Sequence, residues 1–196
     1  MSFNQPLMDR LSFDLFEPDK KWLHLTPNGI VFILWGVTIF FLWAFDSVLP
    51  AHSTGRSVWL AIVLLISFYY LITSFFKYRP LNGQINGKII FQSESFTIGN
   101  KVFDVKDITS VDFGFADFYG KMSSNGRDFS PKFSQGVNNY ISFTDDKNQP
   151  QKFYFRMMTK NSSITLHPFI NEAVKRKAMS YDRAIELIDV ENVIKP

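Results

Sequence analysis

The chain has 196 residues, carries 21 Lys and Arg against 18 Asp and Glu for a net charge of +3, and contains no cysteine. The absence of cysteine excludes disulfides, thiol catalysis and cysteine-ligated zinc. The basic residues are dispersed and no recognised binding motif accompanies them, which argues against a nucleic acid as the partner.

Residues 1–27 form a mostly polar N-terminal segment. Within it, Leu7–Phe16 places apolar residues between charged ones, a pattern typical of a short helix lying on a membrane surface. The acidic residues Asp9 and Asp14 oppose binding to anionic lipid. Docking of this segment onto the rest of the protein, or onto a partner, is therefore an equal alternative.

Two uncharged apolar runs follow, Gly29–Phe45 and Val58–Phe76. The second has 19 residues, which at about 1.5 Å per residue nearly matches the roughly 30 Å hydrocarbon thickness of a bilayer. The first has 17 and spans when its flanks lie at the interface. A signal peptide would place its apolar core nearer the N-terminus. Residues 28–77 are therefore predicted to form a transmembrane helical hairpin.

Positive charge near the helix ends predicts the orientation. The hinge between the two runs holds only Arg56, whereas the outer flanks hold Lys20, Lys21, Lys77, Arg79 and Lys88. We expect both termini in the cytoplasm and the hairpin in a bacterial inner membrane. A soluble domain is disfavoured, because a chain of this length has no layer large enough to surround two wholly apolar helices.

Residues 78–196 are long enough for one cytoplasmic domain with its own core. Short runs in it alternate apolar and polar residues, and turn residues such as Asn86 and Gly87 separate them. These runs are predicted to be strands of an antiparallel meander: Ile85–Phe91, Ser95–Ile98, Val102–Val105, Ile108–Phe118, Asn139–Thr144 and Lys152–Met157.

After the last of these runs the period becomes helical. Pro168 suits a first helical turn, and the apolar stripe that follows contains Phe169 and Ile170. A second short helix is expected after Ser180, an acceptable N-cap. The predicted fold class is α+β, with a C-terminal helix covering an open edge or corner of the sheet.

The order of these elements resembles the bacterial PH-like domains of membrane-anchored proteins, on the segments Gly87–Phe91, Ser95–Gly99 and Val105–Ile108. The resemblance covers roughly residues 84–178. It implies a PH-like antiparallel β-barrel or sandwich closed by a C-terminal helix. It transfers no functional residue, since such domains bind lipids, peptides or partner proteins through different surfaces.

In architecture alone, two helices followed by a small β-barrel also resemble bacterial anti-phage effectors that sense cyclic oligonucleotides and disrupt the inner membrane. No ligand motif in this sequence supports that alternative. The two expected C-terminal helices fit a PH-like closure better than a closed eight-stranded barrel.

The longest irregular stretch, Tyr119–Gly136, is the candidate binding site, because long loops are usually functional or disordered. Its basic side chains suit phosphate oxygens of a lipid headgroup or nucleotide, and its aromatic side chains suit lipid or a partner surface. The alternatives are a mobile solvated loop and, for the asparagine that follows, a turn-closing role. The candidate ligand- or partner-binding residues are Lys121, Arg127, Phe129, Lys132, Phe133 and Asn138.

No catalytic motif occurs, since Gly-x-Ser-x-Gly, Ser-x-x-Lys and His-Glu-x-x-His patterns are all missing. The histidines His24, His52 and His167 lie in three separate regions without a second ligand at metal spacing. We expect a non-enzymatic protein with no catalytic residue, metal site or cofactor.

The sequence therefore predicts a membrane-anchored, cytoplasmic interaction or sensing module that binds a partner protein or a lipid headgroup near the inner membrane. Two alternatives stay open, namely the nucleotide-sensing membrane effector and an accessory subunit of a larger membrane complex. The expected partners are membrane lipid and another membrane protein or a second copy of the chain. A small-molecule nucleotide is an expected partner only if the protein is the nucleotide-sensing membrane effector.

Overall fold

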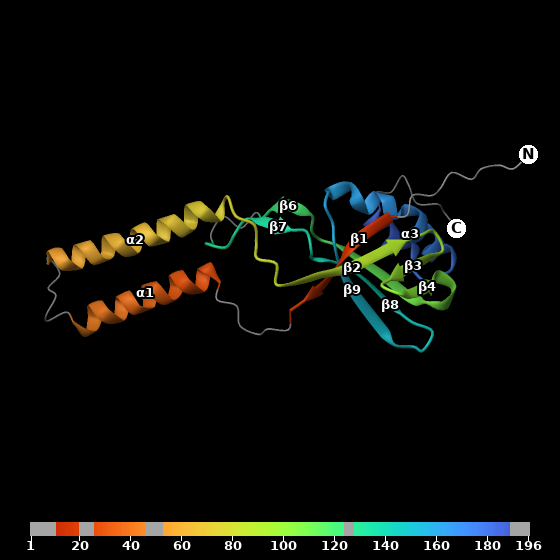
Figure 1. Ribbon diagram of the computed structural model, residues 1–196, viewed down its shortest axis with the longest axis horizontal. Coiled ribbons are helices and arrows are strands. Elements are labelled where there is room, and N and C mark those ends of the chain that lie inside the picture. Colours follow the sequence, from red (N-terminus) through yellow and green to blue (C-terminus); the bar gives the residue numbers. More distant parts are fainter. Residues whose placement is uncertain (1–10, 20–25, 46–52, 124–127, 189–196) are drawn as a thin grey trace, which may run out of the picture. The chain divides into compact units, whose positions relative to one another are not determined.

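The computed structural model describes residues 11–19, 26–45, 53–123 and 128–188 (Figure 1). The chain divides into two compact units. The β unit comprises Met1–Asp19, Leu81–Gly120 and Gln135–Pro196. The helical unit comprises Lys20–Pro80 and Lys121–Ser134. The chain therefore passes from one unit to the other four times, after residues 19, 80, 120 and 134.

The β unit is built on a seven-stranded antiparallel sheet in the order β4-β3-β2-β1-β9-β8-β5. Each strand expected from the alternating pattern is present, to within a few residues at its ends. The bounds are β1 Leu11–Pro18, β2 Gly83–Phe91, β3 Ser95–Ile98, β4 Lys101–Asp104, β5 Thr109–Phe115, β8 Asn139–Thr144 and β9 Pro150–Arg156.

Strand β1 lies in the middle of this sheet, paired with β2 on one side and β9 on the other. Residues 11–16 of the expected surface helix therefore form a strand. The alternation that favours a strand is Leu11, Phe13 and Leu15, and the ring of Phe13 lies 6.0 Å from that of Phe91 and 5.0 Å from that of Phe155. Burial of these side chains between two partners overrides the weaker helical spacing.

The helical hairpin is inserted in the connection between two paired strands. Pro18 at the end of β1 faces Gly83 at the start of β2. The backbone N–H of Asp19 also donates to the carbonyl of Asn82 at 2.9 Å. Residues 20–81, which include both apolar helices, thus take the place of a β-hairpin loop.

The expected β-barrel is not closed. Within the described residues, β4 and β5 stand at opposite ends of the strand order. Two helices, α3 (His167–Lys175) and α4 (Tyr181–Leu187), complete the core. The ring of Phe169 in α3 lies 5.4 Å from that of Phe91, 5.6 Å from Phe96 and 6.0 Å from Phe113. An aromatic side chain from the helix thus fills the space inside the curved sheet.

Helix α4 begins as the sequence predicts, with the Ser180 hydroxyl accepting from the backbone N–H of Arg183 at 3.3 Å. The Arg183 guanidinium donates to the Asp112 carboxylate at 2.7 Å and to the Phe113 carbonyl at 2.9 Å. These bonds fasten α4 to β5. Two 3₁₀ segments, η1 (Val105–Asp107) and η2 (Lys160–Leu166), connect the remaining elements.

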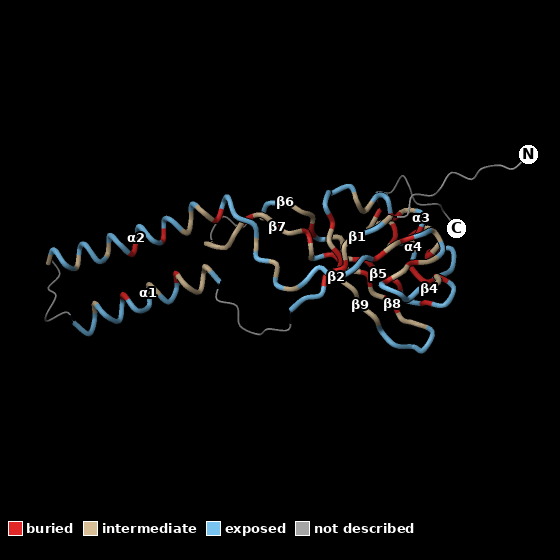
Figure 2. Tube along the Cα trace, viewed as in Figure 1, coloured by how far each residue is buried: buried red, intermediate tan, exposed pale blue. Residues whose placement is uncertain are grey.

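The helical unit contains α1 (Pro27–Ala44) and α2 (Thr54–Ser74), each long and apolar enough to cross a membrane. Thr26 and Ser53 cap them by accepting backbone N–H groups. Figure 2 shows both helices exposed along most of their length. The buried residues are few, namely Val31 and Thr38 in α1 and Val63, Ser67 and Ser74 in α2.

Part of the expected loop Tyr119–Gly136 is a two-stranded ribbon, β6 (Tyr119–Met122) with β7 (Phe133–Gln135). The backbone N–H of Ser123 donates to the Lys132 carbonyl at 2.9 Å. The described parts of this stretch therefore include paired strands, and residues 124–127 lie outside the described residues.

Candidate functional site

The segment 128–134, which holds three of the six expected binding residues, is fastened to the ends of both helices. The backbone N–H of Lys132 donates to the carbonyl of Ser74 at the end of α2, at 2.9 Å. The backbone N–H of Phe129 donates to the Asn28 side chain in the first turn of α1, at 2.6 Å. The first of these bonds satisfies a backbone acceptor that α2 leaves open at its C-terminus.

Arg79 adds further bonds to this segment. Its backbone N–H donates to the Phe133 carbonyl at 2.8 Å, and its guanidinium Nε donates to the Pro131 carbonyl at 3.3 Å. The ring of Phe133 lies 5.4 Å from that of Tyr78. We call residues 128–134 the clasp, because they hold α1 and the chain that leaves α2 in one place.

Lys132 is a buried residue of the clasp, with 1% of its side chain exposed. Its ammonium donates to the Asp128 carbonyl at 2.8 Å and forms an ion pair with the Asp128 carboxylate. It also lies 5.8 Å over the ring of Phe75, directly after α2. A cation at a helix C-terminus complements the helix dipole, which accounts for the position of Lys132 without a ligand.

Of the other expected residues, Phe129 and Phe133 belong to the clasp, whereas Lys121 and Asn138 lie outside it. Lys121 is exposed on β6, Phe129 and Phe133 are half-buried, and Arg127 lies outside the described residues. Asn138 is exposed, and its backbone N–H donates to the Asp117 carboxylate at 3.4 Å. The structure does not bring the described basic side chains Lys121 and Lys132 to one exposed surface.

The neighbouring Asn139 has the turn-closing role that an asparagine at a strand start suggests. Its side chain is buried, accepts from the backbone N–H of Asp117 at 3.0 Å and donates to the Gly136 carbonyl at 2.9 Å. These bonds position the turn before β8.

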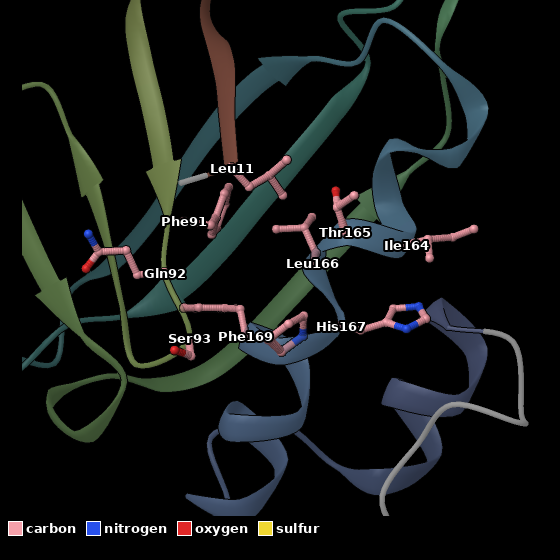
Figure 3. A pocket seen from close by; sticks show the side chains of 10 residues that line it. Leu11, Phe91, Gln92, Ser93, Ile164, Thr165, Leu166, His167 and Phe169 are labelled. Atoms are coloured by element: carbon pink, nitrogen blue, oxygen red, sulfur yellow. The ribbon is translucent and has the colours of Figure 1, made fainter. Parts of the chain in front are cut away.

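The β unit contains a cavity of about 760 Å³. It opens between the start of β1, the turn after β2, and the end of η2 with the first turn of α3 (Figure 3). Figure 3 shows Leu11 and Phe91 on its strand side and Leu166 and Phe169 on its helix side. Ile164 and Pro168 complete the apolar lining.

The polar lining of the cavity is neutral. Gln92, Ser93, Thr165 and His167 contribute hydrogen-bonding groups, and among the described residues no Asp, Glu, Lys or Arg side chain lines the cavity. Burial lowers the pKa of His167 below its ordinary 6.5. The imidazole is therefore uncharged near neutral pH, and the arrangement suits an apolar molecule with a small number of neutral polar groups.

Sequence reasoning missed this cavity, because one wall belongs to β1. The alternation of Leu11, Phe13 and Leu15 is the signal in the sequence for this strand, but apolar residues at helical spacing compete with it. The other walls come from η2 and α3, whose first turn the sequence places correctly at Pro168.

Within residues 11–19, 26–45, 53–123 and 128–188, no group of three or more His, Asp or Glu residues is placed to hold a metal ion. Comparison with protein-family models, curated proteins and solved structures finds no match to this chain.

Proposed function

We propose that this protein is a membrane-anchored interaction and sensing module. In this proposal α1 and α2 span a bacterial inner membrane, both termini lie in the cytoplasm, and the β unit binds a partner protein or a lipid headgroup beside the membrane. We also propose that the β unit is related to the bacterial PH-like domains. Seven antiparallel strands followed by helices support that relation, whereas the open sheet does not. No catalytic step is part of the proposal.

The observation that carries the proposal is the exposure of large apolar side chains along both helices. Phe32 in α1 is 81% exposed, and Phe68 in α2 is 62% exposed. A side chain of this size that stays in water loses about 1.5–3 kcal/mol of the stabilisation that burial would give. A bilayer removes that cost for every exposed position at once, while a soluble core helix would be buried in its own protein.

The orientation is supported by charge. Lys77 and Arg79 follow α2, whereas the only basic residue near the other ends of the helices is Arg56, in the first turn of α2. Lysine and arginine are enriched on the cytoplasmic side of membrane helices. The same residues favour contact with an anionic cytoplasmic leaflet, at about 1 kcal/mol for each basic side chain near the surface.

Tethering is the proposed means of action. The clasp holds the ends of the hairpin, and the chain crosses four times between the helical and β units. A β unit held beside the bilayer meets neighbouring headgroups and membrane proteins at high effective concentration, so a weak contact suffices for binding.

A charged substitution at an exposed position of α2 tests the proposal that the helices span a membrane. Leu65 is 70% exposed near the middle of the helix. Leu65→Arg is tolerated if the helix stands in water, but it opposes insertion by about 2.5–3.5 kcal/mol if the helix spans a bilayer. We expect the wild type to resist alkaline carbonate extraction and Leu65→Arg to be depleted from membranes.

The matched control is Val102→Arg, which charges a similarly exposed position (65%) on β4. This variant should stay in the membrane like the wild type. Extraction of the wild type by carbonate, or equal membrane retention of Leu65→Arg, would contradict the proposal.

Calorimetric titration tests the proposal that the protein binds a lipid headgroup or a partner. The full chain in phosphatidylcholine nanodiscs would be titrated with glycerol 3-phosphate, as a headgroup probe, and with a cyclic dinucleotide. Saturable binding of the cyclic dinucleotide would favour the membrane-effector alternative over the proposal. Saturable binding of the headgroup probe would support the proposal. Co-purification of a stoichiometric membrane protein from mild detergent would favour the alternative of an accessory subunit of a larger membrane complex.

A further inference from the structure

We propose that the cavity between β1, the turn after β2, and η2 with α3 binds an uncharged amphiphile, a molecule with a long aliphatic chain and a hydroxyl or ester group. The inference names a ligand class for the β unit. It rests on the proposed function in one respect, because the bilayer beside the β unit is the source of such molecules.

The cavity has walls that belong to the hydrophobic core. Phe91, Leu166 and Phe169 are all buried, and the rings of Phe91 and Phe169 meet edge to face at 5.4 Å. Close packing fixes these side chains as the floor of the cavity, while the half-buried Leu11 and the exposed Ile164 and Pro168 supply the apolar surface that a ligand reaches. The hollow is therefore a preformed feature of the fold, as ligand sites usually are.

The size of the cavity suits a small molecule. A volume of about 760 Å³ falls within the range of roughly 300–1,000 Å³ that is common for ligand pockets. The apolar walls favour an aliphatic chain, because each methylene group that binds there is removed from water. Ile164, an exposed apolar residue, lines the same cavity and extends its apolar surface to solvent.

The charge of the lining decides between classes of lipid. Among the described residues the lining offers only neutral polar groups, from Gln92, Ser93, Thr165 and His167. A carboxylate or a quaternary ammonium placed there would lose water without gaining a counter-charge, which is costly. A hydroxyl or ester loses less, since a single hydrogen bond replaces its water.

Photo-crosslinking of the full chain in phosphatidylcholine nanodiscs tests this assignment. The probe is hexadecanol carrying a diazirine in its alkyl chain, and mass spectrometry maps the labelled peptides. We expect labels on residues 91–93 and 164–169 as well as on α1 and α2. Unlabelled hexadecanol should remove the labels from the cavity, whereas hexadecyl sulfate at the same concentration should not.

Two variants locate the site. Thr165 is an exposed residue of the lining, so Thr165→Trp fills the cavity without disturbing the core, and cavity labelling should fall at least about tenfold, the effect of a 1.4 kcal/mol loss. Val102→Trp, on β4 and outside the lining, should label like the wild type.

The outcomes distinguish failure of the ligand site from failure of the membrane anchor. Labels on the helices but not on the cavity would overturn the ligand site and leave the membrane anchor supported. Labels on the cavity but not on the helices would support the site and contradict the anchor. Labels on neither would contradict both. Cavity labelling that appears only when residues 1–10 are removed would show that the chain itself occupies the site, and would also overturn the inference.

Discussion

The indole Nε1 of Trp35 in α1 donates a hydrogen bond to Ser67 Oγ in α2 at 3.1 Å, and Ser67 in turn donates to the Val63 carbonyl at 2.9 Å. This bond joins the two helices at a position where the surrounding side chains are apolar. In a bilayer it has no water to compete with it, so it selects one rotation of each helix against the other.

We expect Ser67→Ala to destabilise the hairpin by about 0.6–2 kcal/mol, the span of values for hydrogen bonds between membrane helices. A double-mutant cycle with Trp35→Phe isolates this bond from the change in packing. The measurement is the free energy of unfolding in mixed micelles. A coupling energy of zero between the two positions would show that the bond contributes nothing.

The buried ammonium of Lys132 stabilises the clasp. Lys132→Met keeps the length of the side chain but removes the partner of the Asp128 carboxylate, and we expect a loss of about 1–3 kcal/mol. Thermal unfolding of the full chain in detergent measures it. The double variant Asp128→Asn with Lys132→Met should recover part of the loss, since no carboxylate is then left unpaired.

Lys121→Met is the matched control for this prediction. Lys121 is exposed on β6, so its replacement should change stability by less than about 0.5 kcal/mol. Equal effects at positions 121 and 132 would mean that the buried ion pair has no special role in holding the hairpin ends.

The helical hairpin should be removable from the β unit. Because Asp19 is hydrogen-bonded to Asn82 and Pro18 faces Gly83, a loop of about two to five residues can replace residues 20–81. We expect this chain, with residues 121–134 retained, to fold as a β-rich protein with cooperative unfolding. Circular dichroism during thermal unfolding measures both properties.

The contrasting fragment is residues 80–196, which lacks β1. Its β2 and β9 would lose the strand that lies between them, and two unpaired edges favour aggregation. Cooperative folding of this fragment would contradict the central position of β1, as would failure of the loop-replaced chain to fold.

The sequence predicts those elements whose pattern is local. The strands Ser95–Ile98 and Asn139–Thr144 have the bounds that the alternating pattern predicts. Both apolar helices are long enough to be predicted from the length of their apolar runs. For residues 11–16 the sequence favours a helix, because Leu11 and Leu15 fit a helical spacing and the partners of strand β1 lie far along the chain. Their pairing is a tertiary effect.

The candidate site was harder to predict than the fold. The residues around Lys132 have the composition of a surface loop. In the structure, however, the Lys132 ammonium is buried against Phe75 and Asp128. The cavity combines Leu11, Phe91 and Leu166 from three distant segments. No local sequence pattern predicts that these three segments meet. The turn-closing role of an asparagine at the start of a strand is a local property, and Asn139 has that role in the structure.

The stability of the β unit should depend on the protonation of His167. Burial lowers its pKa below 6.5 in the folded state, so the unfolded chain binds more protons between the two pKa values. The stability that comes from neutral His167 is complete above about pH 6.5 and is lost as the pH falls toward the folded pKa.

Chemical denaturation at about pH 7.5 and about pH 5.5 compares the wild type with His167→Gln. The wild type should lose more unfolding free energy over this interval than the variant does. Equal losses would mean that the imidazole is not desolvated. Glu172, whose pKa is lowered by its bond to Arg176, titrates further toward acid and is the same in both proteins.

The central claim is that α1 and α2 cross a membrane and leave the clasp on the cytoplasmic side. Because the chain has no cysteine, single cysteines at Thr54→Cys, the first residue of α2, and Lys121→Cys, on β6, report the two sides. A membrane-impermeant maleimide applied to intact bacterial cells should label position 54 at once and position 121 only after lysis. Labelling of position 121 in intact cells, or of neither position until lysis, would contradict the account.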